Sequence, residues 1–147
     1  MEDCVISDCM GEGVKINFGA SPLISSCKIH GSGRAGISIQ NRGTAGRIIG
    51  NELWGNFGGG IVVGPSSSPT IENNYFHDHL ISSAEGSGHG VYVCEGGAPC
   101  LGDDNIFLRN GAGGSFFVKA RGQFYYKMGR PALLLEYVVT PRASNEN

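Results

Sequence analysis

Apolar residues recur along this chain with a period of 23 or 24 residues. One repeated element has an apolar residue, a cysteine or small polar residue three positions later, and another apolar residue two positions after that. It begins at residues 24, 48, 71 and 101, so that its steps are 24, 23 and 30. A second element, a triplet with apolar first and third residues, begins at residues 14, 37, 61, 91 and 116. Both series contain the long step at the same place, which predicts one insertion near residues 81–87.

Each repeat contains three short apolar segments separated by turn residues, and no repeat can bury its apolar face alone. Stacking the repeats buries a continuous core, which is the architecture of a solenoid. We therefore predict an all-β fold, a right-handed single-stranded parallel β-helix of about five coils. The repeat domain is expected to span residues 1–121. Residues 122–147 leave the repeat, and we expect them to form a C-terminal tail that is partly a cap and partly disordered.

Alignment of the repeats predicts four columns of inward apolar side chains along the solenoid axis. They are Ile6, Ile29, Leu53, Phe76 and Ile106; Val14, Ile37, Ile61, Val91 and Phe116; Ile16, Ile39, Val63, Val93 and Val118; and Ile24, Ile48, Ile71 and Leu101. One turn carries a column of small polar residues and cysteines, which would bond the backbone of neighbouring coils as in an asparagine ladder. Its predicted members are Cys4, Cys27, Asn51, Asn74 and Asp104.

The composition agrees with a turn-rich repeat fold and narrows the range of expected binding partners. Glycine accounts for 25 of 147 residues, well above the ordinary usage of about 7%, and no Gly-X-Y period accompanies it. The net charge is −2 and there is no basic block, so neither nucleic acid nor a membrane is the expected partner.

The five cysteines have no framework spacing and predict reduced thiols. The start of the chain lacks the pattern of a signal peptide. We therefore expect a cytoplasmic location. Cys94 and Cys100 flank a short loop, and a disulfide between them would instead indicate a secreted protein.

Two segments, Asn-Asn-Tyr-Phe-His-Asp at 73–78 and Gly-His-Gly-Val-Tyr-Val at 88–93, resemble known repeats. They are similar to the right-handed parallel β-helix repeats of the pectate-lyase-like superfold. They look most like the repeats of β-helix F-box proteins and SHC-binding spindle proteins. Bacterial periplasmic carbohydrate-binding and sugar-hydrolase modules have similar repeats. The resemblance covers about residues 4–120 and implies the fold, whereas the activity differs among proteins that share it.

Two motifs suggest catalytic or metal chemistry. Gly88-His89-Gly90 and Gly102-Asp103-Asp104 resemble elements of polygalacturonases, which need paired carboxylates. Their order is reversed here, and the family's Asn-Thr-Asp and Arg-Ile-Lys elements are missing. The cluster His77-Asp78-His79 with His89 contains metal-ligand types, but neighbouring strand residues point to opposite faces. We therefore expect no metal and no cofactor.

Lyases of this superfold bind substrate over the outward face of one sheet, where aspartates hold calcium. The two corresponding rows here contain no carboxylate, and so we expect a chain without catalytic activity. Their members are Lys15, Ser38, Val62, Tyr92 and Phe117, and Asn17, Gln40, Gly64, Cys94 and Lys119.

The predicted outward positions instead supply rings, which form a candidate binding surface unless the tail covers them. These rings belong to Trp54, His77, Tyr92, Phe107 and Phe117. The leading functional hypothesis is a non-catalytic scaffold module that presents a rigid surface for protein–protein interaction, with a protein partner or a neighbouring domain of a larger assembly. The alternative is a carbohydrate-binding or polysaccharide-active β-helix fragment of the lyase, hydrolase or epimerase type.

Overall fold

The computed structural model describes residues 1–102, 104–112, 116–118 and 125–126, and every regular element among them is a β-strand. The strands form three five-stranded sheets in which all neighbours run parallel. Sheet 1 contains β1 (Val5–Ser7), β4 (Lys28–His30), β7 (Glu52–Trp54), β10 (Tyr75–His77) and β13 (Ile106–Leu108). Sheet 2 contains β2 (Val14–Ile16), β5 (Ile37–Ile39), β8 (Ile61–Val63), β11 (Val91–Val93) and β14 (Phe116–Val118). Sheet 3 contains β3 (Leu23–Ser25), β6 (Arg47–Ile49), β9 (Thr70–Glu72), β12 (Cys100–Leu101) and β15 (Tyr125–Tyr126).

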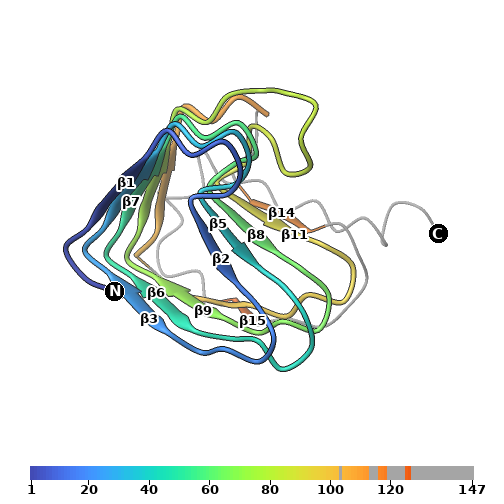
Figure 1. Cartoon of the computed structure of the whole chain (residues 1–147). Coiled ribbons are helices and arrows are strands. Elements are labelled where there is room, and N and C mark those ends of the chain that lie inside the picture. Colours follow the sequence, from blue (N-terminus) through green and yellow to red (C-terminus); the bar gives the residue numbers. More distant parts are fainter. Residues whose placement is uncertain (103, 113–115, 119–124, 127–147) are drawn as a thin grey trace.

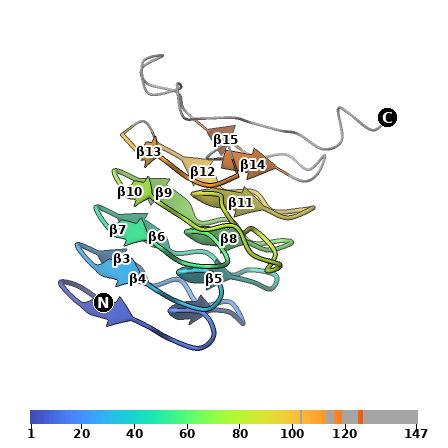
Figure 2. The same ribbon diagram turned by 90° about the horizontal axis from the view of Figure 1, so that it is seen from above.

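The chain visits the three sheets in turn and then begins the next coil on top of the previous one (Figures 1 and 2). This arrangement confirms the predicted parallel β-solenoid. Ile29 pairs with Leu53, and Leu53 pairs with Phe76, as the alignment of repeats predicts. From β1 to β11 and in β13, the central residue of each strand in sheets 1 and 3 and the outer two of each strand in sheet 2 point inward, as does Leu101 of β12. They form one buried core that runs the length of the stack.

The prediction for the last apolar column was wrong by one residue. Phe107, rather than Ile106, pairs with Phe76, and their rings stack with centroids 5.0 Å apart. Leu101 pairs with Ile71 and Ile106 pairs with Tyr75, so four residues separate the first pair from the second in this coil, where three do so in the preceding coil. The additional residue shifts the register, so Ile106 is 46% exposed whereas Phe107 is only 5% exposed. Phe107 therefore belongs to the core and not to the outward surface predicted for it.

A ladder of side-chain amides lies inside the turn that leads from sheet 3 to sheet 1. The Oδ1 atom of Asn74 accepts hydrogen bonds from the backbone N–H (2.9 Å) and the Nδ2 (3.0 Å) of Asn51 in the preceding coil. The Nδ2 atom of Asn74 donates to the carbonyl of Ile48 at 2.8 Å. The pattern continues through Cys27 and Asn105, and Asn105 occupies the position predicted for Asp104, which lies exposed in the turn. We call this set, Cys27, Asn51, Asn74 and Asn105, the asparagine ladder.

The last described strand lies beyond residue 121, the boundary that we expect between the repeat domain and the tail. Strand β15, at Tyr125–Tyr126, pairs with β12 and extends sheet 3 into the segment assigned to the tail. The other residues of the predicted tail lie outside the described part of the chain.

Replacing Asn74 with alanine tests the asparagine ladder. The change removes the acceptor of the buried N–H of Asn51 and a side-chain donor to the carbonyl of Ile48, and a buried N–H left without a partner costs about 1–3 kcal/mol. We expect the free energy of unfolding, measured by urea denaturation, to fall by about 2–4 kcal/mol. Ser68→Ala, at an exposed turn residue, is the control and should change it little. A loss for Asn74→Ala as small as that of the control would contradict the role of the ladder.

Candidate functional site

The insertion lies between β10 and β11 and distinguishes this coil from the others. Residues 78–90 connect these strands, whereas only residues 55–60 connect β7 and β8 in the preceding coil. The insertion is the long yellow-green loop outside sheet 2 in Figure 1. Its hydroxyl groups fasten it, because Ser82 Oγ donates to the carbonyl of Phe57 at 2.6 Å and Ser87 Oγ to that of Ser82 at 2.9 Å. The predicted position of the insertion, near residues 81–87, is therefore confirmed.

The insertion covers part of the outward face of sheet 2. Ser38 and Val62 occupy outward positions on β5 and β8 but are only 3% and 7% exposed. Gly86 lies so close that a Cβ atom there would be 2.9 Å from Val62 Cγ2. Tyr92, the next residue in the same row, is half-buried, and its ring lies 5.5 Å from that of His89 at the end of the insertion. The insertion therefore covers part of the aromatic strip that we predicted there, while the side chain of Phe117 lies outside the described part.

A groove of about 520 Å³ runs between the insertion and the outward face of sheet 2. Its walls come from the turns that precede β2, β5 and β8, and from the insertion itself. The lining residues are Glu12, Gly33, Arg34, Ala35, Ser38, Gln40, Phe57, Val62, Ser82, Ser83, Ala84 and Glu85. Hydroxyl, amide, carboxylate and guanidinium groups thus surround a small apolar area, an arrangement that suits a polar ligand.

The groove contains carboxylates that the two strand rows alone do not show. Glu12 comes from the turn before β2, and Glu85 comes from the insertion, so neither falls in a strand row. Glu12 forms ion pairs with Lys15 at 3.6 Å and with Arg34 at 3.7 Å. The ring of Phe57 is 41% exposed at the edge of the groove. The only sequence signal for this site was the insertion, because a loop that departs from a strict repeat is often functional.

The outward face of sheet 1 carries a second group of predicted site residues, Trp54 and His77. The ring of Trp54 stacks on His30 on one side, with centroids 4.2 Å apart, and on His77 on the other side, 5.6 Å apart. The three rings are nearly parallel, with interplanar angles of 11° and 7°. Both faces of the indole are thus occupied by protein rings, and only the ring edges reach solvent. Trp54 therefore does not offer a face on which a sugar ring could stack.

An ion-pair network holds His77 in place beside this stack. Its Nε2 lies 2.8 Å from Glu52 Oε2, and its Nδ1 lies 2.6 Å from Asp78 Oδ2. Asp78 also accepts two hydrogen bonds from Arg109, each 2.9 Å long. Arg109, followed by His77, lowers the pKa of the Asp78 carboxyl group to about 2. The carboxylate therefore stays ionised, and the network braces sheet 1 across neighbouring coils.

Comparison with known proteins decides the family. The model of the right-handed β-helix region matches residues 1–126, most of the chain. The chain belongs to the right-handed β-helix family. This match adds the handedness of the coil to the parallel solenoid described above. No curated protein and no solved structure matches the chain closely enough to count as similar.

The described residues of the polygalacturonase-like motifs, which we did not expect to be catalytic, lie apart in the β-helix. Asp104 lies at the corner between sheets 3 and 1, and His89 lies at the corner between sheets 1 and 2, while Asp103 is outside the described part. His77 points outward, whereas His79 is buried, and so the two imidazoles lie on opposite sides of the chain. Among the described residues, no group of three or more histidine, cysteine, aspartate or glutamate side chains could hold a metal ion.

Sequence reasoning missed a second buried polar ladder, inside the turn that leads from sheet 1 to sheet 2. We call its members, Ser32, Asn56, His79 and Asn110, the mixed ladder. The Oδ1 atom of Asn56 accepts from the N–H of Ser32 at 2.9 Å, and that of Asn110 accepts from the N–H of His79 at 3.3 Å. Each member follows a member of the asparagine ladder by five residues, which is a signal that the sequence contained.

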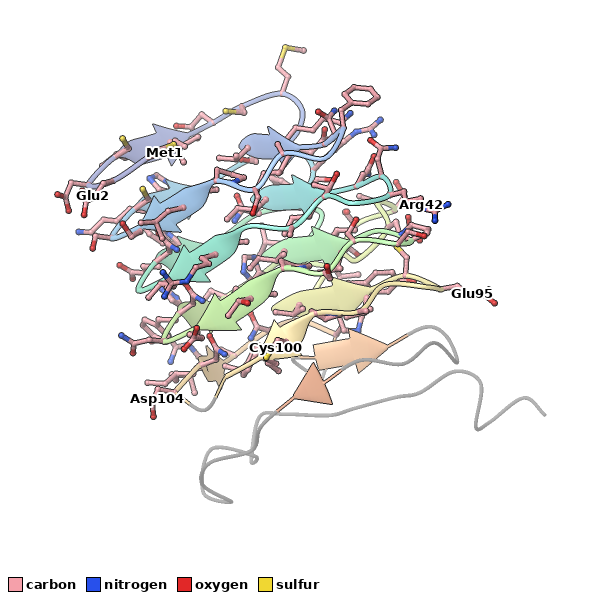
Figure 3. All side chains as sticks on the ribbon, turned by 90° about the horizontal axis from the view of Figure 1, so that it is seen from below. Met1, Glu2, Arg42, Glu95, Cys100 and Asp104 are labelled. Atoms are coloured by element: carbon pink, nitrogen blue, oxygen red, sulfur yellow. The ribbon has the colours of Figure 1, made fainter. Side chains whose placement is uncertain are left out.

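The cysteines of the β-helix are thiols, and the disulfide considered between Cys94 and Cys100 is absent. Cys94 Sγ donates to Glu85 Oε2 at 3.7 Å, on the insertion side. Figure 3 shows Cys100 on the strand β12 and Glu95, the residue after Cys94, at the far end of the turn. The described residues also include no helix long and apolar enough to cross a membrane.

Replacing Gly86 with alanine tests whether the insertion packs on sheet 2 as described. The added methyl group would meet the carbonyl of Gly58 and the side chain of Val62, both at 2.9 Å, at a positive φ of 82°. Gly43→Ala is a matched control, because Gly43 has a similar φ of 78° and no atom within 4 Å of the added Cβ.

We expect Gly86→Ala to lower the free energy of unfolding by about 1–3 kcal/mol more than the control does, as overpacking commonly costs. The measurement is urea denaturation, combined with limited proteolysis at residues 78–90. Equal effects of the two substitutions would show that the insertion does not pack against Val62.

Proposed function

We propose that this β-helix is a non-catalytic carbohydrate-binding module and that the groove beneath the insertion is its binding site. The groove carries this proposal because it combines a concave shape with many short polar side chains and one exposed ring. The exposed side chains of Gln40 and Ser83 offer amide and hydroxyl groups to the hydroxyl groups of a sugar. The exposed face of Phe57 offers an apolar surface on which a sugar ring can stack.

The charges in the groove favour binding over cleavage. Hydrolysis of a glycosidic bond needs one carboxyl group that donates a proton and a second carboxylate. Glu12 forms ion pairs with Lys15 and Arg34, so its carboxylate is engaged by two cations of the groove itself. Of the two carboxyl groups in the lining, this leaves Glu85 alone for a mechanism that requires two.

Titration with neutral oligosaccharides tests the binding site. We expect cello-, xylo- or galacto-oligosaccharides to shift the amide NMR signals of residues around Phe57, Gln40 and Ser82. Phe57→Ala should weaken binding about tenfold, equivalent to about 1.4 kcal/mol, because the stacking surface is lost. Leu23→Ala, on the partly exposed strand β3 of sheet 3, is the control and should bind as the unaltered chain does.

Two results would contradict this proposal. One is the absence of any signal change near the groove with the whole oligosaccharide series at millimolar concentration. The other is saccharide binding that survives Phe57→Ala unchanged and shifts signals on sheet 1 or sheet 3 instead.

We also expect no cleavage of polygalacturonate, alginate or pectin, with or without calcium, as measured by release of reducing or unsaturated ends. Turnover that disappears in His89→Ala or Asp103→Ala would show that the polygalacturonase-like motif is catalytic after all.

Protein–protein interaction, the leading hypothesis from the sequence, is a second candidate function that the outward face of sheet 1 supports. Val5 and Ile106 expose aliphatic side chains on the two outer strands of this face, β1 and β13, and the strands that carry the braced stack of Trp54 and His77 lie between them. A rigid face with exposed apolar groups and a charged rim resembles known interfaces. The resemblance of residues 73–78 to the repeats of F-box and spindle-type β-helix proteins points the same way.

Comparative affinity capture separates the two functions. If sheet 1 binds a protein, Ile106→Lys should remove that partner from the captured material, whereas Phe57→Ala should retain it. A partner that is lost with Phe57→Ala and retained with Ile106→Lys would instead place the interaction in the groove.

A further inference from the structure

The mixed ladder contains one ionisable member, His79, at the point where the insertion begins. His79 is the second residue after β10, and its imidazole occupies the place that the amides of Asn56 and Asn110 take in the neighbouring coils. The side chain is 1% exposed. Its ring packs over Gly60, where a Cβ atom would lie 3.0 Å from Nε2. The buried ring therefore anchors the first residues of the insertion to the coil below, while the backbone N–H of His79 bonds to Asn110 of the coil above.

The hydrogen bonds of His79 require a neutral ring. The Nδ1 atom lies 3.3 Å from the backbone nitrogen of Asn56, whose N–H can only donate, so Nδ1 must be unprotonated. The proton of the neutral ring is then on Nε2, which has no hydrogen-bond partner within the described part of the chain. An asparagine at this position could satisfy both bonds, as Asn56 does through Oδ1 and Nδ2. Histidine can make only one of them.

Protonation would remove the bond that His79 makes and bury a charge. A protonated Nδ1 would direct its hydrogen toward the N–H of Asn56, and so this nitrogen would lack an acceptor. Burial lowers the pKa of His79 from 6.5 to about 3, and the backbone groups of Asn56 and Leu53 oppose this shift only in part. Below pH 6.5 a ring that has left its site takes up a proton more readily than a ring in place, so acid favours the released form.

We propose that His79 is an acid-sensitive latch, whose protonation releases the insertion from the mixed ladder and thereby opens the wall of the groove. Opening of the wall requires only the contacts described above. Its consequence, release of a bound saccharide in acid, rests on the function proposed for the groove. The core strands keep their structure in acid, because no other buried residue in the described part of the chain carries an imidazole.

The charged groups around His79 do not offset the effect of burial on its pKa. On its own strand and turn, His77 disfavours the protonated ring and Asp78 favours it, and Asp78 is already paired with Arg109 of the next coil. Residues 55–60 of the coil below contain no charged side chain. His89, at the other end of the insertion, also has a pKa lowered by burial, and so it adds to the acid response with the same sign.

Hydrogen exchange resolved by residue tests the latch without any ligand. Because the released ring has its ordinary pKa of 6.5 and the docked ring one of about 3, opening should be about 30-fold more favourable at pH 5 than at pH 7.5. We expect amide protection at residues 79–88, corrected for intrinsic rates, to fall by about that factor. Protection at Ile37–Ile39 and Ile61–Val63 should not change.

His79→Asn is the decisive variant, since asparagine is the residue of the neighbouring ladder positions. It should abolish most of the pH dependence at residues 79–88, and His89→Gln should leave most of it in place. The ring itself gives a second measurement in the unaltered chain: its NMR signals should report the Nε2–H tautomer, neutral at pH 5.

Three results would overturn the latch. The first is a protection loss in acid that His79→Asn does not reduce. The second is an equal loss in the core strands, which would indicate general acid unfolding. The third is a protonated His79 ring at pH 5 in a chain whose insertion stays protected. If the latch opens but no oligosaccharide binds the groove at pH 7.5, the latch stands and the carbohydrate proposal fails.

Discussion

The structure depends on hydrogen bonds that buried side chains make from one coil to the next. A parallel β-helix turns the chain sharply three times in each coil, and at the turns backbone groups face the interior where water cannot reach them. Leaving such a group without a partner costs about 1–3 kcal/mol. The amides of Asn51 and Asn74 satisfy these groups and, because each bonds to the next coil, they also fix the register. The apolar columns can then align, and the flat sheets that carry the proposed sites follow.

The insertion is the one large departure from this regular repeat among the described residues. A coil that obeyed the period would leave the outward face of sheet 2 open, as a flat surface. Residues 78–90 leave the period, bond to the preceding coil at Phe57 and enclose a groove against Ser38 and Val62. The same segment contains His79, a ladder residue whose Nε2 has no hydrogen-bond partner within the described part of the chain. The proposed binding groove and the incompletely bonded ladder residue thus lie in one segment, while the rest of the β-helix forms a rigid base.

The sequence predicted the parts of the fold that repeat. The period placed Ile29, Leu53 and Phe76 in one column and located the insertion, because burial in a solenoid imposes the same spacing on every coil. The prediction of residue positions failed where neighbouring residues were chemically alike. Ile106 and Phe107 are both apolar, Asp104 and Asn105 are both small and polar, and a single added residue in the turn decided between them.

The groove could not be predicted from the strand rows. Its carboxylates, Glu12 and Glu85, come from turns, and their approach to sheet 2 depends on how the insertion folds back. The mixed ladder escaped notice because serine, asparagine and histidine share no pattern of residue type, although their constant offset from the asparagine ladder was present. The aromatic surface was overestimated, since pairing turned Phe107 inward and stacking closed both faces of Trp54.

The central claim is that buried amide side chains tie the coils together, and exchange of their own protons measures this directly. The Nδ2 protons of Asn51 and Asn74 bond to carbonyl and amide oxygens inside the turn. We expect them to exchange with solvent as slowly as the backbone amides of Ile61–Val63, because both require the coils to separate. The Nδ2 protons of the exposed Asn73 should exchange at the rate of an unprotected amide. Equally fast exchange at Asn73 and Asn74 would show that the ladder opens on its own, and that the coils are held together by the apolar columns alone.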